Sequence, residues 1–415
     1  MSICGCRGIG TGRSNRSRSP STPDGSTAWL QWGGPRRNFV VDAPPLATSW
    51  PAEGPRQIWR RPLGSGFSSI VTDGTTLYTL YRRGDDDVAI AMDAATGRTV
   101  WETRYAAPFI ETCSQPIGPA PRAAPLVAGD RLVTVSAGGL MNSFDRRTGS
   151  IVWSLNLLAG ADAVRACGYS SSPLAYKDRI LTTAGGKGRG VLAIDAATGR
   201  IAWQAHDFEN GYSSPILIDL DGRPELVVFT FGEISGIDPE TGRLEWQRPH
   251  PADFGVNVAT PVWGDDDHLL FVSSAYNGGS RVLKLARAGA AVSVTEVWAT
   301  RRVRIHFGNA VRFGPRIFAS NGDLGSAPLA AIDVATGEMM WRDRAVARAT
   351  LVGAGSRLIL LDEDGNLAIA TPGDAGLVVQ ARAQILDSRS WTAPTLSGAT
   401  LFVRNEKEIV ALDLR

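Results

Sequence analysis

The chain has few of the residues from which metal and redox sites are built. Among its 415 residues there are only four cysteines and four histidines, and no two cysteines are adjacent. No Cys-x-x-Cys-His motif occurs, so covalently attached c-type haem is not expected. No phosphate-binding glycine loop is present either. These absences argue against several common classes of enzyme.

Long apolar runs and a surplus of one charge are also missing. No apolar stretch approaches the roughly 20 residues that a membrane helix requires. Lysine and arginine number 43 against 41 aspartates and glutamates, which gives a net charge of +2, and the basic residues form no stripe. We therefore expect neither a transmembrane segment nor a nucleic-acid partner.

The first 28 residues are rich in serine, arginine and glycine. They are basic like the start of a signal peptide, but no apolar segment of about 7–15 residues follows them. Cys4 and Cys6 likewise lack the preceding apolar stretch of a lipoprotein signal. We expect residues 1–28 to be a disordered leader, or to precede the true start of the protein.

What the chain does contain is a repeat. Five segments follow the pattern Asp-x-x-Thr-Gly-x-x-x-Trp, and degenerate copies lie at 282–298, 367–381 and 408–415. Each unit, such as 169–205, divides into four short apolar-alternating stretches separated by turn signals. Four strands in about 40–50 residues is the period of a propeller blade. The sequence therefore predicts an all-β fold, a single eight-bladed β-propeller of four-stranded antiparallel blades over residues 29–415.

The residues of the repeat have structural explanations. The aspartate can cap the turn between the third and fourth strands, and the glycine supplies the positive φ of that turn. The tryptophan is large enough to reach the next blade, and part of segment 29–59 should pair with the last blade to close the ring. The third strands are expected to end near Asp93, Asp145, Asp195, Asp238, Lys284, Asp333, Thr371 and Asp413. The linking tryptophans are Trp59, Trp101, Trp153, Trp203, Trp246, Trp298 and Trp341, with Val379 in the eighth position.

These copies resemble the repeat of pyrroloquinoline-quinone (PQQ) propellers, found in quinoprotein alcohol dehydrogenases and in BamB-type outer-membrane assembly lipoproteins. The resemblance covers about residues 29–415, and segments 29–69 and 390–414 look most like the BamB-like subgroup. It implies eight blades docked by tryptophan, usually outside the cytoplasm.

The resemblance leaves two classes of function open. A quinoprotein dehydrogenase needs Ca²⁺ held by carboxylate and amide oxygens, a catalytic aspartate, an arginine near the quinone and, in the alcohol dehydrogenases, adjacent cysteines. None of these motifs matches a position here, so we expect no catalytic residue, metal or cofactor. The favoured hypothesis is a monomeric, non-catalytic scaffold of the periplasm or cell envelope that binds a protein or peptide partner in envelope assembly. The alternative is a PQQ- and Ca²⁺-dependent dehydrogenase acting on an alcohol.

A candidate binding site lies where the chain enters the innermost strand of each blade. Propeller ligands usually meet these loops around the mouth of the channel. Rings and guanidinium groups recur in these loops, and they would suit a peptide or a planar anion. The alternative is that they fill a narrowing channel as core. We name this set the collar: Phe67, Arg122, Tyr169, Tyr212, Asn257, Arg304, His306, Phe307, Asn309, Arg348 and Trp391.

Two features of the collar loops carry expectations of their own. His306 has no second histidine or cysteine at metal-ligand spacing, so no zinc site is expected. Cys113 and Cys167 stand 12 and 14 residues after Trp101 and Trp153, in matching loops of adjacent blades. They are candidates for a disulfide that would tie blade two to blade three and indicate an oxidising compartment, and the alternative is two unrelated buried thiols.

Overall fold

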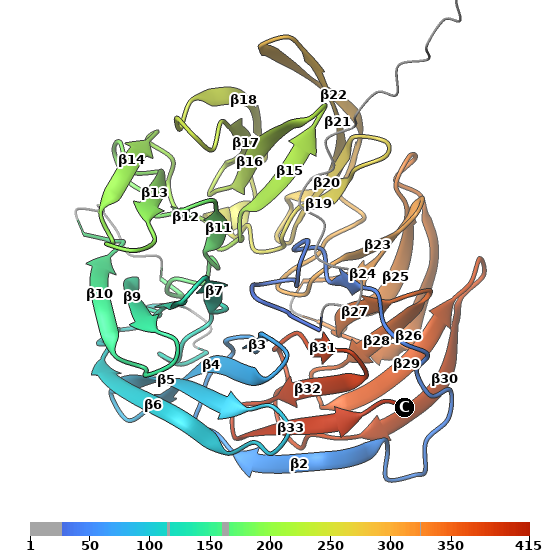
Figure 1. Ribbon diagram of the computed structural model, residues 1–415. Helices are drawn as coiled ribbons and strands as arrows, with labels where there is room; N and C mark the ends of the chain where they lie inside the picture. The colour runs from blue at the N-terminus through green and yellow to red at the C-terminus, as the bar shows by residue number, and fades with distance from the viewer. Residues whose placement is uncertain (1–26, 114–116, 160–165, 324) are drawn as a thin grey trace, which may run out of the picture.

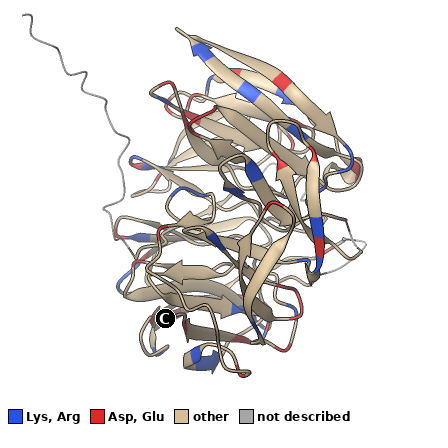
Figure 2. Cartoon of the chain, turned by 90° about the vertical axis from the view of Figure 1, so that its right-hand side faces the viewer, with Lys and Arg blue, Asp and Glu red and all other residues tan. Residues whose placement is uncertain are grey.

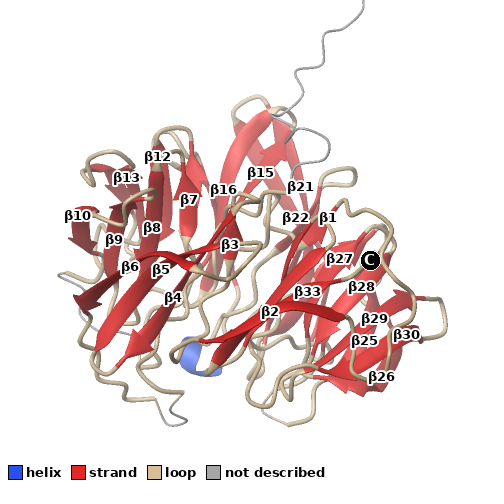
Figure 3. Ribbon diagram, turned by 60° about the horizontal axis from the view of Figure 1, so that its bottom comes forward, coloured by secondary structure: helices blue, strands red, loops and turns tan. Residues whose placement is uncertain are grey.

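The strands of the chain are arranged as a ring of eight sheets around a central channel (Figure 1). The computed structural model describes residues 27–113, 117–159, 166–323 and 325–415, so residues 1–26 of the expected leader lie outside the described residues. The described chain is almost entirely β-structure, with one helical turn, η1 (Asp253–Gly255), on one face (Figure 3). The predicted eight-bladed, all-β fold is confirmed.

Each blade has four strands, and neighbouring strands within it run antiparallel. From the channel outward, blade one consists of β3 (Val71–Thr72), β4 (Thr76–Arg83), β5 (Asp86–Asp93) and β6 (Thr99–Ala106). Blade two consists of β7 (Leu126–Ala128), β8 (Arg131–Val135), β9 (Leu140–Asp145) and β10 (Ile151–Asn156), and blade three of β11 (Leu174–Tyr176), β12 (Arg179–Thr183), β13 (Val191–Asp195) and β14 (Ile201–Ala205). Blade four consists of β15 (Ile216–Leu220), β16 (Arg223–Phe229), β17 (Glu233–Ile237) and β18 (Leu244–Pro249).

The second half of the ring continues the same order. Blade five consists of β19 (Val262–Gly264), β20 (Leu269–Ser274), β21 (Gly279–Ala288) and β22 (Ala291–Thr300). Blade six consists of β23 (Val311–Phe313), β24 (Arg316–Ser320), β25 (Pro328–Asp333) and β26 (Met339–Ala347), and blade seven of β27 (Thr350–Ala354), β28 (Arg357–Leu361), β29 (Asn366–Pro372) and β30 (Leu377–Gln384). Blade eight consists of β31 (Thr395–Ser397), β32 (Thr400–Arg404), β33 (Glu408–Asp413) and β2 (Arg56–Pro62).

Blade eight is completed by a strand from the start of the chain. Strand β2 pairs antiparallel with β33, in a register that runs from Arg56 opposite Asp413 to Pro62 opposite Glu408. The expectation that segment 29–59 contributes to ring closure is confirmed. A second pairing was not expected: β1 (Val40–Val41) lies parallel to β27, the innermost strand of blade seven.

The repeated motif forms the joints between blades. The indole N–H of Trp101 in blade one donates to the carbonyl of Arg146 in blade two, at 2.9 Å. Its ring covers Gly149, where an added Cβ would lie 2.5 Å from the ring and where φ is +75°. In the same turn Asp145 accepts the N–H of Thr148 at 2.9 Å. Equivalent indole bonds join Trp59 to Ala94, Trp153 to Ala196, Trp203 to Pro239, Trp298 to Val334 and Trp341 to Gly373.

Every blade also carries a register shift where its fourth strand passes the tryptophan position. In blade two the shift lies between Ile151 and Trp153, so Val152 is the extra residue of a β-bulge. A bulge increases the local twist of the outer strand and makes its free edge a poorer template for another strand. The outer rim of the ring is thereby protected.

Two blades depart from the expected pattern. In blade five the third strand continues past Lys284 to Ala288, because the next turn comes at Gly289, where φ is +62°. The resulting β21–β22 hairpin projects beyond the other blades (Figure 1). In blade seven the residue that occupies the tryptophan position is Ala381, opposite Ile369, and not Val379.

Candidate functional site

The two faces of the ring carry different loops. Strands one and three of each blade run in the same direction, so the loops that enter the innermost strands lie on the face opposite the Asp-x-x-Thr-Gly turns. We call the first the collar face and the second the turn face. The collar residues were selected from loops of the collar face.

The channel between the faces is filled by residues 29–41 of the chain itself, which run inside the ring (Figure 1, dark blue). The backbone of Trp29 pairs with Thr72 in blade one, with hydrogen bonds of 2.7 and 2.8 Å. Two blades away, in blade seven, the carbonyl of Phe39 accepts the N–H of Gly353 at 2.8 Å. Trp29 and Phe39 are both 2% exposed, so this segment is part of the core.

A buried arginine anchors this segment near the collar face. Arg37 donates to the carbonyls of Ser172 and Pro173, each at 3.0 Å, immediately before blade three begins. Trp32 donates to the hydroxyl of Thr260 before blade five, at 2.9 Å. Burial lowers the pKa of Arg37 to about 9. The carbonyls that receive its hydrogen bonds compensate part of the cost of burying the charge.

Three collar residues lie in the interior of the blades. Tyr169, Asn257 and Asn309 are at most 3% exposed, so a ligand on the collar face cannot reach them without a rearrangement. Their side chains donate hydrogen bonds that hold the loops in place. The acceptors are the carbonyls of Thr183, Thr230 and Leu351, at 2.7, 2.8 and 2.7 Å.

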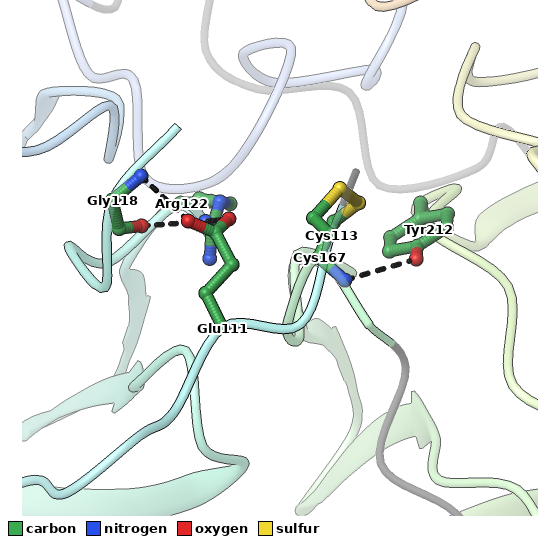
Figure 4. Close-up of a disulfide and its surroundings, with 6 residues drawn as sticks. All are labelled: Glu111, Cys113, Gly118, Arg122, Cys167 and Tyr212. Carbon is green, nitrogen blue, oxygen red and sulfur yellow. Dashed lines mark hydrogen bonds and ion pairs between the residues drawn. A yellow bond between two sulfur atoms is a disulfide. The ribbon is translucent and has the colours of Figure 1, made fainter. Parts of the chain in front are cut away.

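One half of the collar is cross-linked and neutralised. The structure has a disulfide between Cys113 and Cys167, whose Cα atoms are 4.8 Å apart, and Tyr212 lies beside it and accepts the N–H of Cys167 at 3.4 Å (Figure 4). On the same loop Glu111 pairs with Arg122 at 2.9 Å, and both side chains are less than a tenth exposed (Figure 4). Burial lowers the pKa of Arg122, although the charge of Glu111 opposes this shift.

The other half of the collar is a group of partly exposed rings. Phe307 and Trp391 have centroids 4.6 Å apart, Phe67 lies 5.4 Å from Trp391, and His306 lies 4.3 Å from Phe307. The guanidinium carbon of Arg348 stands 5.7 Å from the Phe307 ring. The structure therefore brings together five collar residues that belong to loops far apart in the sequence.

The arginines of this half have acidic partners that the sequence interpretation did not include. Arg348 pairs with Glu363 at 3.1 Å, and the indole N–H of Trp391 donates to the other oxygen of Glu363 at 3.2 Å. Arg304 pairs with Asp323 at 2.7 Å. Both acids come from hairpins between second and third strands, and neither was predicted to be part of the site.

Two further aromatic residues extend the group. The rings of Tyr276 and His306 are 4.8 Å apart and nearly perpendicular, and those of Phe254 and Tyr276 are 6.0 Å apart and also nearly perpendicular. Phe254 lies in η1 and is 79% exposed. Neither residue was predicted, because Tyr276 is in a β20–β21 hairpin and Phe254 stands well ahead of β19. We name the connected rings the aromatic ribbon: Phe254, Tyr276, His306, Phe307, Trp391 and Phe67.

The space behind the ribbon is small. A pocket of about 20 Å³ lies among His306, Phe307, Arg348 and Trp391, enough for about one water molecule. Burial, with a smaller contribution from the charge of Arg348, lowers the pKa of His306 to about 4, so its ring is neutral at pH 7. A broader, open depression of about 500 Å³ lies away from the ribbon, beside blades three and four.

The residues of the channel do not fit a quinone with its calcium ion. A ligand-sized site needs roughly 300 Å³ or more, and segment 29–41 fills the axis of the ring. Among the described residues no group of three or more His, Cys, Asp or Glu side chains is close enough to hold a metal ion. The buried charge on the axis is Arg37, which is already bonded to backbone carbonyls. We therefore derive no catalytic step through PQQ.

Within the described residues no helix is long and apolar enough to span a bilayer. On the side of the molecule that Figure 2 shows, basic and acidic residues are interspersed, with no extended area of one sign.

Comparison with known proteins gives relatives of the same architecture. Outer membrane protein assembly factor BamB of Yersinia pestis is 25% identical over 228 residues, which are 51% of this chain and 53% of that protein. The matched part is thus about half the length of that relative. The crystal structure of BamB from Moraxella catarrhalis superposes with a TM-score of 0.58 at 17% identity, covering 86% of this chain and 97% of that one. Quinohemoprotein alcohol dehydrogenase from Comamonas testosteroni has a TM-score of 0.53 at 12% identity, covering 94% and 80%. At such identities the structural matches establish the fold alone.

The family assignment rests on the sequence of the repeats. A family model described as outer membrane protein assembly factor BamB matches residues 22–206 and 125–304, which together exceed half of the chain. These residues include the Asp-x-x-Thr-Gly turns of blades one to four and the tryptophans that meet them. The chain belongs to the BamB-like family of PQQ-repeat β-propellers.

Proposed function

We propose that this protein is a non-catalytic scaffold that binds a protein or peptide partner through the aromatic ribbon on its collar face. The observation that carries the proposal is the ribbon itself, six rings in contact, ending in the 79% exposed Phe254, above a channel closed by the chain's own residues. Aromatic and arginine side chains are the residues enriched at protein interfaces. A surface of this kind offers contact area for a partner.

The names of the relatives support a place for this scaffold in outer-membrane assembly. The disulfide between Cys113 and Cys167 supports an oxidising compartment such as the periplasm. A monomer is consistent with the closed ring, because β2 completes blade eight and the bulges protect the outer edges. The partner would then be another protein of the envelope.

The dehydrogenase alternative is less well supported. The quinoprotein neighbours share the fold, but a shared fold does not carry a shared activity. The channel position is taken by Arg37 and its segment, and the described acidic side chains form no metal-binding group. Alcohol-dependent dye reduction, or a Ca²⁺-dependent thermal shift with PQQ, would overturn the non-catalytic proposal.

Site-specific photo-cross-linking in cells that export the protein tests the proposal. A photoreactive amino acid replaces Phe254 on the collar face or, as a matched control, the exposed Ala197 on the turn face. We expect adducts with a component of the outer-membrane assembly machinery from position 254, at several times the yield from position 197. Equal yields, or no adduct from position 254, would contradict binding at the collar face.

A further inference from the structure

We infer that the aromatic ribbon binds an extended, proline-rich segment of the partner, in the polyproline II conformation. This inference rests on the proposed function, because it names the chemistry of the segment that the collar face would hold. Three features of the ribbon support it: the spacing of its rings, the kind of hydrogen-bonding groups that remain at its surface, and the backbone conformation that holds the rings.

Successive rings of the ribbon are turned relative to one another instead of stacking face to face. Tyr276 stands edge-on to both of its neighbours, at interplanar angles of 84° to His306 and 86° to Phe254. At the other end Phe307, Trp391 and Phe67 are tilted by 46° and 33° from one ring to the next. Polyproline II segments dock into aromatic-lined grooves of this kind, because their flat pyrrolidine rings fit between aromatic side chains.

The acidic groups beside the ribbon already have hydrogen-bond partners. Carboxylates bonded to ribbon residues are already engaged: Glu363 bonds Arg348 and Trp391, and Asp323 bonds Arg304 and the N–H of Tyr276. A surface whose carboxylates are already engaged favours a chain that has few N–H groups to satisfy.

Two donors remain beside the rings. The hydroxyl of Tyr276 has no hydrogen-bond partner among the described residues. The exposed guanidinium of Arg389 stands 4.6 Å from the Trp391 ring and makes no ion pair within the described part of the chain. Proline offers a carbonyl and has no N–H. A proline-rich segment therefore matches the rings and the donors at once.

The backbone holds the rings in an uncommon conformation. Phe254, Tyr276 and Arg348 have φ of 62°, 47° and 49°, in the left-handed region that bulky residues seldom adopt. Such conformations persist only where the surrounding structure enforces them. The ribbon is thus preformed at Phe254 and Tyr276, and a segment that is itself stiff, as polyproline II is, loses little freedom on binding there.

Fluorescence anisotropy of labelled peptides tests the inference. The probes are fluorescein-labelled decaproline, a glycine-serine peptide of the same length and a glutamate-rich peptide of the same length, and a neutral oligosaccharide serves as competitor. We expect decaproline to bind at least about tenfold more tightly than the glycine-serine peptide, as for a contact made by hot-spot aromatic residues. Phe254→Ala and Trp391→Ala should each weaken it by about tenfold, and Tyr276→Phe, which keeps the ring, by a smaller factor.

The control is Trp263→Ala, which removes a partly exposed indole that stacks on His268 near the turn face and should leave decaproline binding unchanged. Equal affinity for decaproline and the glycine-serine peptide, or no effect of Phe254→Ala and Trp391→Ala, would overturn the inference. So would preference for the glutamate-rich peptide or displacement by the oligosaccharide. If cross-linking from position 254 succeeds while decaproline fails, the scaffold function stands and only the chemistry of the segment is wrong.

Discussion

At the scale of single residues, the repeated motif joins a blade to the preceding one. Asp195 accepts the N–H and the hydroxyl of Thr198, at 2.8 and 2.6 Å, which fixes the turn. Gly199 has φ of +73°, and a Cβ there would lie 2.6 Å from the ring of Trp153 in the preceding blade. The glycine is thus required twice, by the turn and by the ring that covers it. Motif and tryptophan act together although they belong to different blades.

Replacing one of these tryptophans should therefore lower the free energy of unfolding much more than replacing the residue next to it. Trp153→Ala loses a 9% exposed ring and its 3.0 Å hydrogen bond to Ala196, so we expect the free energy of unfolding to fall by about 3–5 kcal/mol. Val152→Ala, at the 43% exposed bulge position, should change it by no more than about 0.5 kcal/mol. Urea unfolding of the two variants measures both values. Similar losses of unfolding free energy would contradict the role of Trp153 in joining the two blades.

His250 makes a separate contribution at the residue scale. It is fully buried, edge-on to Phe229 at 5.0 Å, and burial, with a smaller effect of the Arg281 charge, lowers its pKa to about 3. An unfolded histidine has a pKa near 6.5, so between about pH 6.5 and 3 the unfolded chain binds more protons. Stability from this group is present above about pH 6.5 and is lost as the pH falls.

We expect His250→Phe to remove that part of the pH dependence. The slope contributed by one such group is at most about 1.4 kcal/mol per pH unit. Urea unfolding at several pH values between 7 and 4 should show a shallower decline for the variant than for the wild type. Parallel declines would mean that His250 is protonated in the folded protein as well.

At the scale of elements, most departures from the regular pattern have local causes. The β21–β22 hairpin is long because its copy of the repeat lacks the Asp-x-x-Thr-Gly turn, and the chain reverses only at Gly289. Trp246 consequently has no such turn to meet, and its indole bonds Glu225 of its own blade. Glu225 in turn pairs with Arg287 of the long hairpin at 2.7 Å. The loss of one turn in blade five thus changes the contacts that both blade four and blade five make at their junction.

The sequence predicted the elements better than their ends. Alternation and turn residues located the strands of all eight blades, because each blade buries its own strands in a repeating way. The position of Ala381 was missed because it follows Thr371 by ten residues, whereas Trp101 follows Asp93 by eight, and the segment between contains no Thr-Gly pair to align. The acids Glu363 and Asp323 were missed because their partnership with arginines of other loops exists only after the ring has closed.

The disulfide is an element-scale cross-link whose removal has a defined cost. It joins loops separated by 54 residues, so Cys113→Ser with Cys167→Ser should lower the free energy of unfolding by about 2–4 kcal/mol. Thermal unfolding with and without reductant checks this, since the wild type should respond to reductant and the double variant should not. Decaproline binding should persist in the variant, because the ribbon lies on the other half of the collar.

At the scale of the whole molecule, the start of the chain has two separate tasks. Strand β2 closes the ring by pairing with β33, while residues 29–41 fill the channel through Arg37, Phe39 and the parallel strand β1. The first task could be predicted, because a four-stranded blade was incomplete without it. The second could not, because residues 29–50 have no strand alternation, and their place is set by contacts with blades on opposite sides of the ring.

Two truncations separate these tasks. A variant that begins at Gly54 keeps β2 and loses the channel segment, so we expect a folded ring with a lower melting temperature and an open axis. A variant that begins at Leu63 also loses β2, which leaves β33 unpaired at the edge and removes the Trp59 bond to Ala94 that joins blade eight to blade one. Since one such joint is worth about 3–5 kcal/mol, the second variant should lose at least that much more stability and should associate through its free edge. Calorimetry and size-exclusion chromatography distinguish the outcomes. If the two variants melt at the same temperature and both remain monomeric, pairing of β2 with β33 is not what holds the ring closed.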